Sequence, residues 1–348
     1  MPLSKFFGGR ILKTGISVFI TAFICLALEW PAIFAVITAI VTIEPTASDS
    51  IKKGIIRFPA SAIGAAYSML FTALIGDKAI TYSLSAVFTI ITCHKLRLDA
   101  GILVATLTAV NMIPITHDHF FDSFLVRIGT TTVGLVVSTI VNLVVLPPHY
   151  SKMIVSNTSD LLTKAGKLLR NIMDESHTSK KNKETVNLFN HLMKSLEKAE
   201  QLCQYQREEW KYHRHNEEEM REVHYEHKKL LVLRQILFHI GNIMYAPVDK
   251  TSVHISHNQE MASTVNAIAS LIESETHLHL EDHDALIEKL MNYFWQLKEV
   301  QDSSEHHAHF TSEEIVIYEL LAINELGERL HNIHHSERKN NKLHSNNK

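Results

Sequence analysis

The pattern of apolar and polar positions divides the chain into two unlike parts. From about Ile11 to Leu146 charged residues are sparse and apolar runs dominate, whereas the sequence from His149 onward is rich in Glu, Lys, His, Asn and Gln. This asymmetry is typical of a membrane segment followed by a soluble domain. The overall net charge of −3 averages over both parts and therefore says nothing about partners.

Six apolar runs in the first part predict transmembrane helices. They are Ile11–Leu28, Pro31–Ile43, Phe58–Ile75, Ala79–Cys93, Ala100–Ile115 and Phe124–Leu146. A bilayer core requires about 20 apolar residues per helix, within a range of roughly 17 to 25, which the first, third and sixth runs satisfy. The other three runs are short, so four full spans with re-entrant pieces are the alternative to six spans.

The Lys and Arg residues of the short loops predict the orientation. If the N-terminus is inside, the inner segments carry nearly all of them and the outer segments carry only Lys78 and Arg127. This bias places both termini, and with them the polar second part, in the cytoplasm. The expected location is a plasma membrane of the bacterial type.

The polar second part has helical periodicity almost throughout. Apolar positions recur at helical spacing between Met153 and Met173, and further helices are predicted at 185–214, 217–245, 258–274, 282–301 and 311–333. We therefore expect an all-α chain with a transmembrane domain over 1–147 and a cytoplasmic antiparallel helical bundle over 148–335. The tail 336–348 is polar without periodicity and is predicted to be disordered.

A repeated unit lies within the apolar part. Ile43–Gly64 reads IEPTASDSIKKGIIRFPASAIG, and Ile113–Gly134, 70 residues later, reads IPITHDHFFDSFLVRIGTTTVG. In this register Arg57 coincides with Arg127 and Gly64 with Gly134. Three spans per copy is an odd number, so the second copy is expected to enter the membrane upside down, as an inverted 3+3 repeat.

The repeat predicts where a substrate would pass, because inverted-repeat transporters bind near the midplane at short, proline-interrupted segments. The candidates for a substrate or ion path are Glu44, Pro45, Arg57, Arg127, Asn111 and Pro114. For the charged residues the alternative is a side chain that extends to the interface from a span end. For Asn111 the alternative is an interhelical hydrogen bond.

Small residues every four positions on the third and sixth spans predict close helix packing. They are Ala60, Gly64 and Ser68, followed by Thr130, Gly134 and Ser138. An interface between repeats or subunits and routine helix packing both fit this spacing.

No enzyme, cofactor or metal signature accompanies these features. The sequence has no GxxxxGK[ST] loop, no GxSxG and no HExxH, so we expect neither catalysis nor ATP-driven transport by this chain alone. Cys25, Cys93 and Cys203 are far apart and odd in number, and the 23 histidines define no zinc site. Mixed charge signs in the polar part disfavour nucleic-acid binding.

The stretch Ile37–Ala65, ITAIVTIEPTASDSIKKGIIRFPASAIGA, resembles the aromatic acid exporter family. The layout of a six-span half followed by a helical domain resembles the branch with an aromatic acid exporter C-terminal domain, which is related to fusaric acid resistance proteins. The resemblance implies a plasma-membrane efflux protein that is proton-driven and oligomeric. Larger relatives carry two membrane halves in one chain, which implies that a homodimer supplies the second half here.

Three functional hypotheses follow. The first is a secondary exporter of small amphipathic or aromatic carboxylic acids, in which Arg57 and Arg127 attract the carboxylate and partial burial raises the pKa of Glu44, so that it carries the coupling proton. The second is a membrane-anchored scaffold or envelope-maintenance protein whose cytoplasmic bundle binds a partner, without transport. The third is a channel-like path. The scarcity of polar residues in the spans favours the scaffold.

Overall fold

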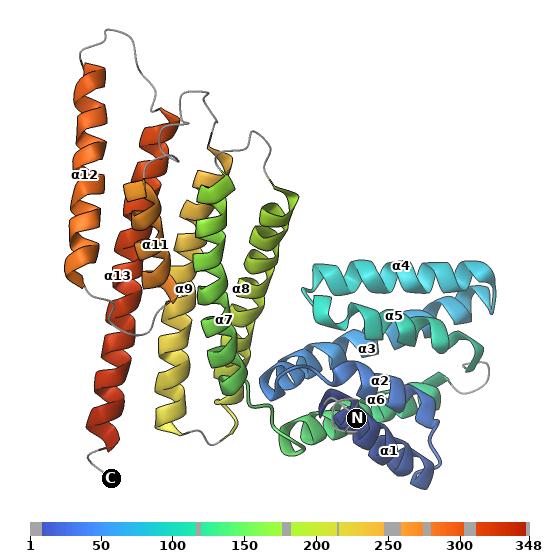
Figure 1. Cartoon of the computed structure of the whole chain (residues 1–348). Coiled ribbons are helices and arrows are strands. Elements are labelled where there is room, and N and C mark those ends of the chain that lie inside the picture. The colour runs from blue at the N-terminus through green and yellow to red at the C-terminus, as the bar shows by residue number, and fades with distance from the viewer. Residues whose placement is uncertain are drawn as a thin grey trace. The chain divides into compact units, whose positions relative to one another are not determined.

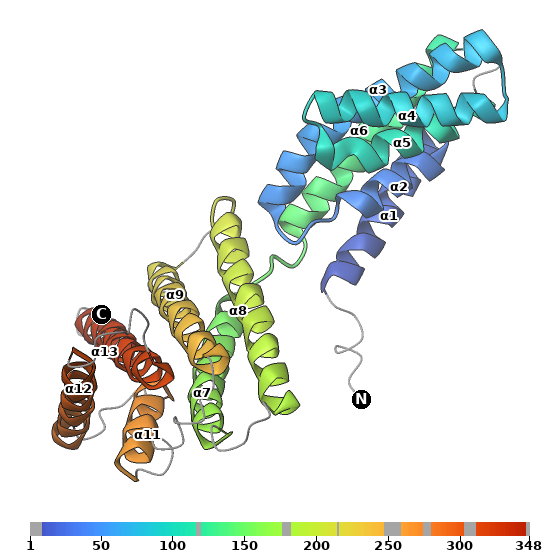
Figure 2. The ribbon, with the colours of Figure 1, turned by 90° about the horizontal axis from the view of Figure 1, so that it is seen from above.

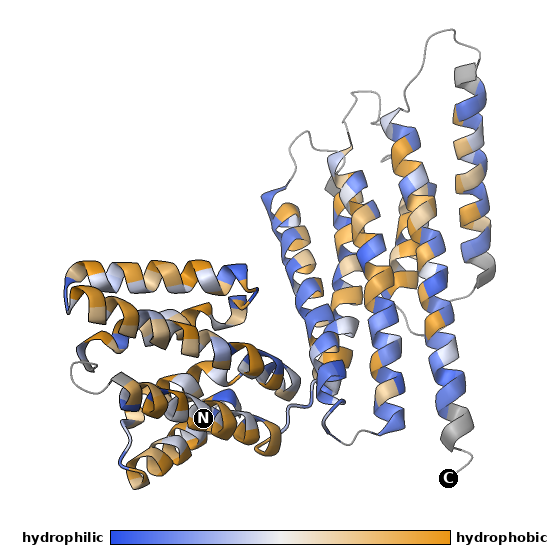
Figure 3. Ribbon diagram, turned by 180° about the vertical axis from the view of Figure 1, so that it is seen from behind, coloured by the Kyte–Doolittle hydropathy of each residue, from blue (hydrophilic) through white to orange (hydrophobic). Residues whose placement is uncertain are grey.

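The computed structural model describes residues 9–115, 120–175, 182–213, 216–246, 259–273, 280–302 and 311–345. All regular secondary structure in these ranges is helical, which confirms the predicted all-α class. The chain divides into two compact units, Met1–His149 with Tyr205–Arg214, and Tyr150–Gln204 with His215–Lys348. Hydrophobic residues dominate the helices of the first unit, while those of the second mix hydrophobic and hydrophilic residues (Figure 3).

The first unit contains six helices within the described residues. They are α1 (Gly9–Ala27), α2 (Ala32–Thr42), α3 (Ala47–Ile75), α4 (Ala79–Lys95), α5 (Ile102–Asn111) and α6 (Phe120–Val144), shown in Figure 1. In this part of the chain α1, α3 and α6 are long and apolar enough to cross a membrane, and α2 and α5 are shorter apolar helices. This composition makes the first unit membrane-type, while the number of spans stays a prediction.

Helix α3 begins at Ala47, eleven residues before the span that the apolar run predicted at Phe58. The hydroxyl of Thr46 caps its N-terminus by accepting from the backbone N–H of Asp49 at 3.0 Å. Pro59 lies inside the helix without ending it. The helix is therefore longer than the predicted run Phe58–Ile75, because a cap and polar partners inside the protein stabilise it from Ala47 onward.

In the first unit, the third helix of each repeat copy packs on the second helix of the other copy. Helix α3 packs on α5, and α6 packs on α2. A Cβ atom at Gly64 would collide with the carbonyl oxygen of Ala105, and one at Gly134 with the carbonyl oxygen of Ala35. These two contacts are equivalent in the repeat, because Gly134 lies 70 positions after Gly64 and Ala105 lies 70 positions after Ala35. The helices lie together as one bundle (Figure 2), with the contact pattern of a pseudo-two-fold axis.

Helices α1 and α4 are also equivalent in the repeat, but their sequence offset differs slightly from 70 residues. Both pack on two helices of the bundle, α1 on α2 and α6, and α4 on α5 and α3. Their buried positions also correspond, but at an offset of 68 rather than 70. The buried residues are Lys13, Ser17, Thr21 and Cys25 on α1, and Thr81, Ser85, Thr89 and Cys93 on α4. The connection from α4 to α5 is therefore two residues longer than the connection from α1 to α2, which shifts the register of α1 and α4 relative to the rest of the repeat.

The second unit is built from long amphipathic helices. They are α7 (Ser151–Glu175), α8 (Lys183–Glu209) up to Gln204, α9 (Glu217–Tyr245), α11 (Gln259–Glu273), α12 (Leu280–Asp302) and α13 (Ser312–Ser345). Helix α9 packs on α7 and on α13. Its largest fully buried side chains are Leu230, Leu233, Ile236, Leu237 and Ile240. Each such side chain contributes about 1.5–3 kcal/mol through burial, so α9 supplies much of the core.

Helix α13 continues to Ser345, so the prediction of a disordered tail from Ser336 is wrong over the described residues. Glu337 forms an ion pair with Lys229 of α9 at 2.7 Å, and the amide of Asn340 donates to the hydroxyl of Tyr225. These polar contacts to α9 replace the apolar stripe whose absence suggested disorder. Residues 346–348 of the predicted tail lie outside the described part.

Candidate functional site

Glu44 and Arg57, both predicted as site residues, form a buried ion pair in the first copy of the repeat. Arg57 is 6% exposed, and its Nη2 donates to Oε1 of Glu44 at 2.7 Å. The Arg57 Nε also donates to the carbonyl oxygen of Ala100 at 3.2 Å. The ammonium of Lys53 donates to the other carboxylate oxygen at 2.9 Å. The positive charge of Arg57 is therefore already neutralised within the chain.

Glu44 lies in the connection between α2 and α3, and its surroundings favour the ionised carboxylate. Burial alone would raise its pKa, but hydrogen bonds from Lys53 and Arg57, together with their charges, outweigh burial and hold the pKa below the usual 4.5. The expected increase in the pKa of Glu44 is thus wrong. A carboxylate held ionised by two cations is poorly suited to exchange a proton near neutral pH.

Arg127, in the second copy, has no such partner. It is also 6% exposed, and its Nη2 donates to the hydroxyl of Thr108. Its guanidinium carbon lies 4.3 Å from the centre of the Phe34 ring. Among the described residues, Nε and Nη1 of Arg127 have no hydrogen-bond acceptor and no carboxylate within 4.0 Å. A buried cation with unsatisfied donors is costly, so this guanidinium is a ready site for an anion.

Hydroxyl groups from three helices meet beside Arg127. The Ser61 Oγ of α3 lies 3.1 Å from the Thr108 Oγ1 of α5 and 3.2 Å from the Thr131 Oγ1 of α6. Ser61 and Thr131 occupy equivalent positions in the two copies, so their contact lies on the pseudo-two-fold axis. This group of hydroxyls was not predicted from the sequence, although the 70-residue offset between Ser61 and Thr131 is a signal that indicates it.

Arg57 and Arg127 differ in their partners because the two copies of the repeat carry different residues at one equivalent position. Glu44, the partner of Arg57, corresponds to Pro114 in the second copy. Proline offers no acceptor side chain, so within the described residues Arg127 lacks a carboxylate like the one that pairs with Arg57. The two copies thus place their arginines in similar helical surroundings, but Arg57 pairs with a carboxylate, whereas Arg127 has no counter-ion among the described residues.

The structure does not bring the other predicted path residues to an arginine in the same way. The side-chain amide of Asn111 donates to the carbonyl oxygen of Leu107 in its own helix at 2.9 Å. Pro114 is exposed in a short 3-10 turn, Ile113–Ile115, and Pro45 follows Glu44 in the α2–α3 connection. The small residues predicted for helix packing, Ala60, Gly64, Ser68, Thr130, Gly134 and Ser138, are all buried.

A second polar group surrounds Lys13, which sequence analysis treated only as an inner-loop charge. The buried ammonium of Lys13 donates to Oδ1 of Asn142 at 2.8 Å. The Asn142 amide in turn donates to the carbonyl oxygens of Glu44 and Thr46, each at 3.1 Å, and to the hydroxyl of Ser50 at 2.7 Å. Asn142 therefore makes interhelical bonds that fix the α2–α3 connection.

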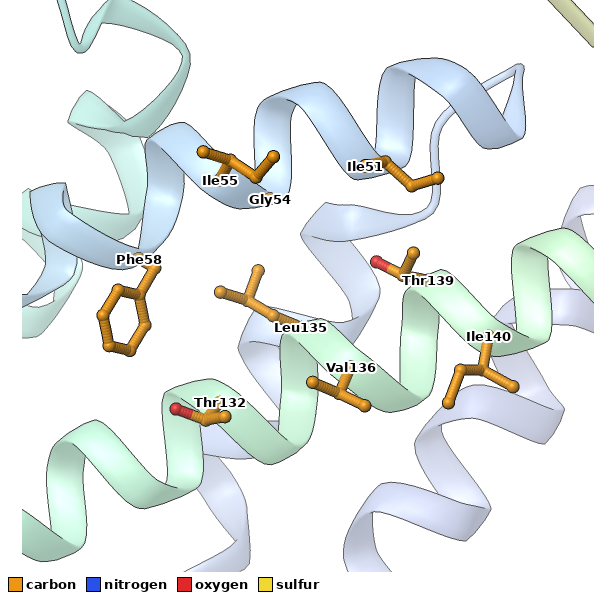
Figure 4. Close-up of a pocket in the computed structure, with 9 residues that line it drawn as sticks. All are labelled: Ile51, Gly54, Ile55, Phe58, Thr132, Leu135, Val136, Thr139 and Ile140. Atoms are coloured by element: carbon orange, nitrogen blue, oxygen red, sulfur yellow. The ribbon is translucent and has the colours of Figure 1, made fainter. Parts of the chain in front are cut away.

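An apolar groove of about 460 Å³ runs between α3 and α6 (Figure 4). Phe58 lies near Thr132 and Leu135 at one end, and Ile51 faces Thr139 at the other, so the two helices run antiparallel along it. Ile55, on its rim, is 70% exposed. The groove therefore opens onto the apolar outer surface of the first unit.

Fold and site together define an all-α membrane protein with an internal repeat and buried arginines between its helices. Residues 5–145 match the family described as "Aromatic acid exporter family member 1". A "UPF0421 protein" of Bacillus cereus is 45% identical over 344 residues, which cover 97% of this chain and 96% of the relative. The chain belongs to the aromatic acid exporter family.

Similar relatives occur in other genera. A "UPF0421 protein" of Oceanobacillus iheyensis is 41% identical over 338 residues, which cover 94% of this chain and 96% of the relative. One from Staphylococcus haemolyticus is 37% identical over 323 residues, which cover 91% of this chain and 96% of the relative. The similarity therefore includes both units of the chain, and family membership makes this a membrane protein of a transporter family.

Proposed function

We propose that the protein exports small amphipathic or aromatic carboxylic acids, and that Arg127 binds the carboxylate. The observation that carries this proposal is the buried guanidinium of Arg127, which has two N–H-bearing atoms without an acceptor among the described residues. A carboxylate matches the planar fork of arginine and supplies the missing charge. The Phe34 ring beside it offers an apolar surface for the rest of the substrate.

The hydroxyl group gives this site a polar wall. Ser61, Thr108 and Thr131 can each accept or donate a hydrogen bond, so they accommodate a carboxylate or a ring hydroxyl. They come from α3, α5 and α6 and meet near the pseudo-two-fold axis, where inverted-repeat transporters bind their substrates. This convergence of polar residues removes the main argument for the scaffold alternative, which rested on their scarcity.

The proposal includes the orientation, the driving force and the assembly expected from the sequence. Both termini face the cytoplasm, and the second unit is cytoplasmic. The proton gradient drives export in this scheme, as the family resemblance implies, and the sequence offers no phosphate-binding loop for ATP. Glu44 has no place as proton carrier in this scheme, since it neutralises Arg57. Two copies of the chain form the working transporter.

The first test is the accumulation of radiolabelled benzoate in cells that lack the protein. The intact chain should lower accumulation, and a protonophore should abolish this effect. Arg127→Gln removes a charged hydrogen-bonding partner worth about 1.5–3 kcal/mol, so the apparent affinity should fall about 10- to 100-fold. Arg97→Gln, at an exposed arginine of the same unit, is the matched control and should transport normally.

A second variant supplies the carboxylate that the repeat lacks. Pro114→Glu places an acid at the position equivalent to Glu44, where it should pair with Arg127 and compete with the substrate. Pro114→Gln has the same length without the charge and should transport. Equal transport by both variants would contradict a carboxylate site at Arg127. Equal accumulation in all strains over a panel of aromatic acids would instead support the scaffold.

A further inference from the structure

The segment Tyr205–Arg214 belongs to the first unit and carries ionisable side chains that the proposed site does not use. It includes the last turn of α8 and the residues that follow it. Glu208, Glu209 and His213 make its polar contacts with the beginning of α3 and the end of α6. These contacts join the ends of two long apolar helices that are not close in the sequence.

Glu209 completes the N-terminus of α3. Its Oε1 accepts from the backbone N–H of Ala47, the first residue of the helix, at 2.7 Å, and its side chain is 3% exposed. The first N–H groups of a helix have no partner within the helix, and its N-terminus attracts negative charge. Glu209 therefore satisfies a donor that Thr46, which caps the N–H of Asp49, leaves unpaired.

Glu208 adds a contact that does not change near neutral pH. Its carboxylate accepts from Lys211 at 2.7 Å, from the Ser48 hydroxyl at 2.6 Å and from Lys52 at 3.0 Å. The hydrogen bonds from Lys211, Ser48 and Lys52 lower the pKa of Glu208 to about 2. It stays ionised throughout the physiological range, so any pH response must come from another residue.

His213 links Glu209 to α6. Its Nδ1 lies 3.0 Å from Oε2 of Glu209, and its Nε2 lies 2.7 Å from the carbonyl oxygen of Leu143. Both neighbours can only accept hydrogen bonds. A neutral imidazole has one N–H, whereas the protonated ring has two. The contact with Glu209 has the distance of an ion pair but not the geometry of a hydrogen bond, so it holds only when His213 is protonated, while Nε2 donates to Leu143.

The other charged groups near this segment are already engaged in contacts of their own. Glu209, its direct partner, also interacts electrostatically with Lys13 of α1. Lys52 of α3 and Lys211 are engaged with Glu208. From α6 the contact is the Leu143 carbonyl, which does not titrate.

We infer that residues 205–213 form a proton-dependent latch that ties the beginning of α3 to the end of α6. It is closed when His213 is protonated, and it loosens when the ring loses its proton and with it the ion pair with Glu209. The latch lies beside the α2–α3 connection, where Asn142 already holds the carbonyl oxygens of Glu44 and Thr46. Closing it restrains this connection, so it slows any step in which the connection moves.

The latch is tested on the full chain in lipid vesicles, with Trp210 as the only tryptophan after Trp30→Phe and Trp295→Phe. Quenching of Trp210 fluorescence by acrylamide reports how open the segment is. Quenching should increase as the pH rises from ~6 to ~8, the range in which histidine commonly titrates. In the His213→Gln variant, acrylamide should quench Trp210 strongly at every pH. His94→Gln, at an exposed histidine of the same unit, should keep the pH dependence.

The Glu209→Gln variant distinguishes the negative charge of Glu209 from its role as a hydrogen-bond acceptor. It can still accept from the Ala47 N–H but cannot pair with protonated His213, so it should also lose the pH dependence. Quenching of the parent that is constant with pH, or a His213→Gln profile equal to that of the parent, would overturn the inference.

The transport consequence rests on the proposed function. His213→Gln should export benzoate faster than the parent at pH ~6, where the parent latch is closed, and at the same rate at pH ~8. If no strain transports, the proposed function fails while the fluorescence result still decides the latch. If transport occurs but the quenching does not respond to pH, only the latch fails.

Discussion

The side chain of Lys13 lies among apolar helices, where an ammonium group is costly unless hydrogen bonds compensate for the loss of water. Asn142 provides this compensation through its side-chain and backbone oxygens, at 2.8 and 3.1 Å. The same amide holds the α2–α3 connection through its Nδ2. One asparagine thus satisfies a buried charge and positions the connection that carries Glu44.

We therefore expect Asn142→Leu to destabilise the protein by about 3–5 kcal/mol, because the buried ammonium of Lys13 loses its side-chain partner and keeps only the backbone carbonyl oxygen of residue 142. The double variant Lys13→Met/Asn142→Leu removes the charge as well and should recover part of the loss. Thermal unfolding of the purified protein in detergent, followed by circular dichroism, measures both. A double variant no more stable than Asn142→Leu alone would contradict this account.

At the residue scale, the sequence identified Glu44, Arg57 and Arg127 as charges near span ends, and it could do no more. Whether such a charge is neutralised depends on neighbours from other helices, as the pairing of Arg57 with both Glu44 and Ala100 shows. The expected pKa shift of Glu44 had the wrong sign because burial was visible in the pattern and two adjacent cations were not.

At the element scale, two glycines allow the helices of the repeat to approach. A Cβ atom at Gly64 or Gly134 would collide with the backbone of α5 or α2, which cannot yield as a side chain tip does. At Gly54, in the same helix as Gly64, a Cβ atom would meet only the Thr139 hydroxyl, at 4.0 Å. The three glycines are therefore expected to respond differently to the same substitution.

Gly64→Ala and Gly134→Ala should each cost about 1–3 kcal/mol through overpacking. Gly54→Ala should be neutral or stabilising by up to ~1 kcal/mol, because alanine is the better helix former. Midpoints of thermal unfolding in the same detergent compare all three. Equal effects of Gly54→Ala and Gly64→Ala would show that helix propensity, not the close approach, decides.

Element boundaries could be predicted only where apolar periodicity sets them. The cap at Thr46 and the partners of Ser48 and Lys52 start α3 early, and these partners lie far along the chain. Contacts with α9 extend α13 through a polar sequence. The 68-residue offset of α1 and α4 was not visible, because the repeat was aligned on the identities in the later helices.

At the scale of the whole molecule, the first unit tests the predicted topology. Lys78 and Lys95 are exposed at opposite ends of α4, and the loop bias places Lys78 outside and Lys95 inside. The native thiols Cys25, Cys93 and Cys203 are all buried, so they should add little background to cysteine labelling.

A membrane-impermeant maleimide should therefore label Lys78→Cys in intact cells, whereas Lys95→Cys should react only after the membrane is opened. The extent of labelling can be followed by a gel shift. Labelling of Lys95→Cys alone in intact cells would reverse the orientation, and labelling of both would contradict a span between them.

Two similar halves inserted in opposite senses have no preferred direction of their own, since each face of such a frame resembles the other. The pairing of Glu44 with Arg57, and the proline at the corresponding position 114, make the two faces unequal. In the proposed exporter, a negatively charged molecule would meet an arginine paired with a carboxylate in one half and, within the described residues, an arginine without one in the other. That one acidic position would then decide which half presents an arginine to an anion, while the gradients of substrate and coupling ion decide the direction of net movement.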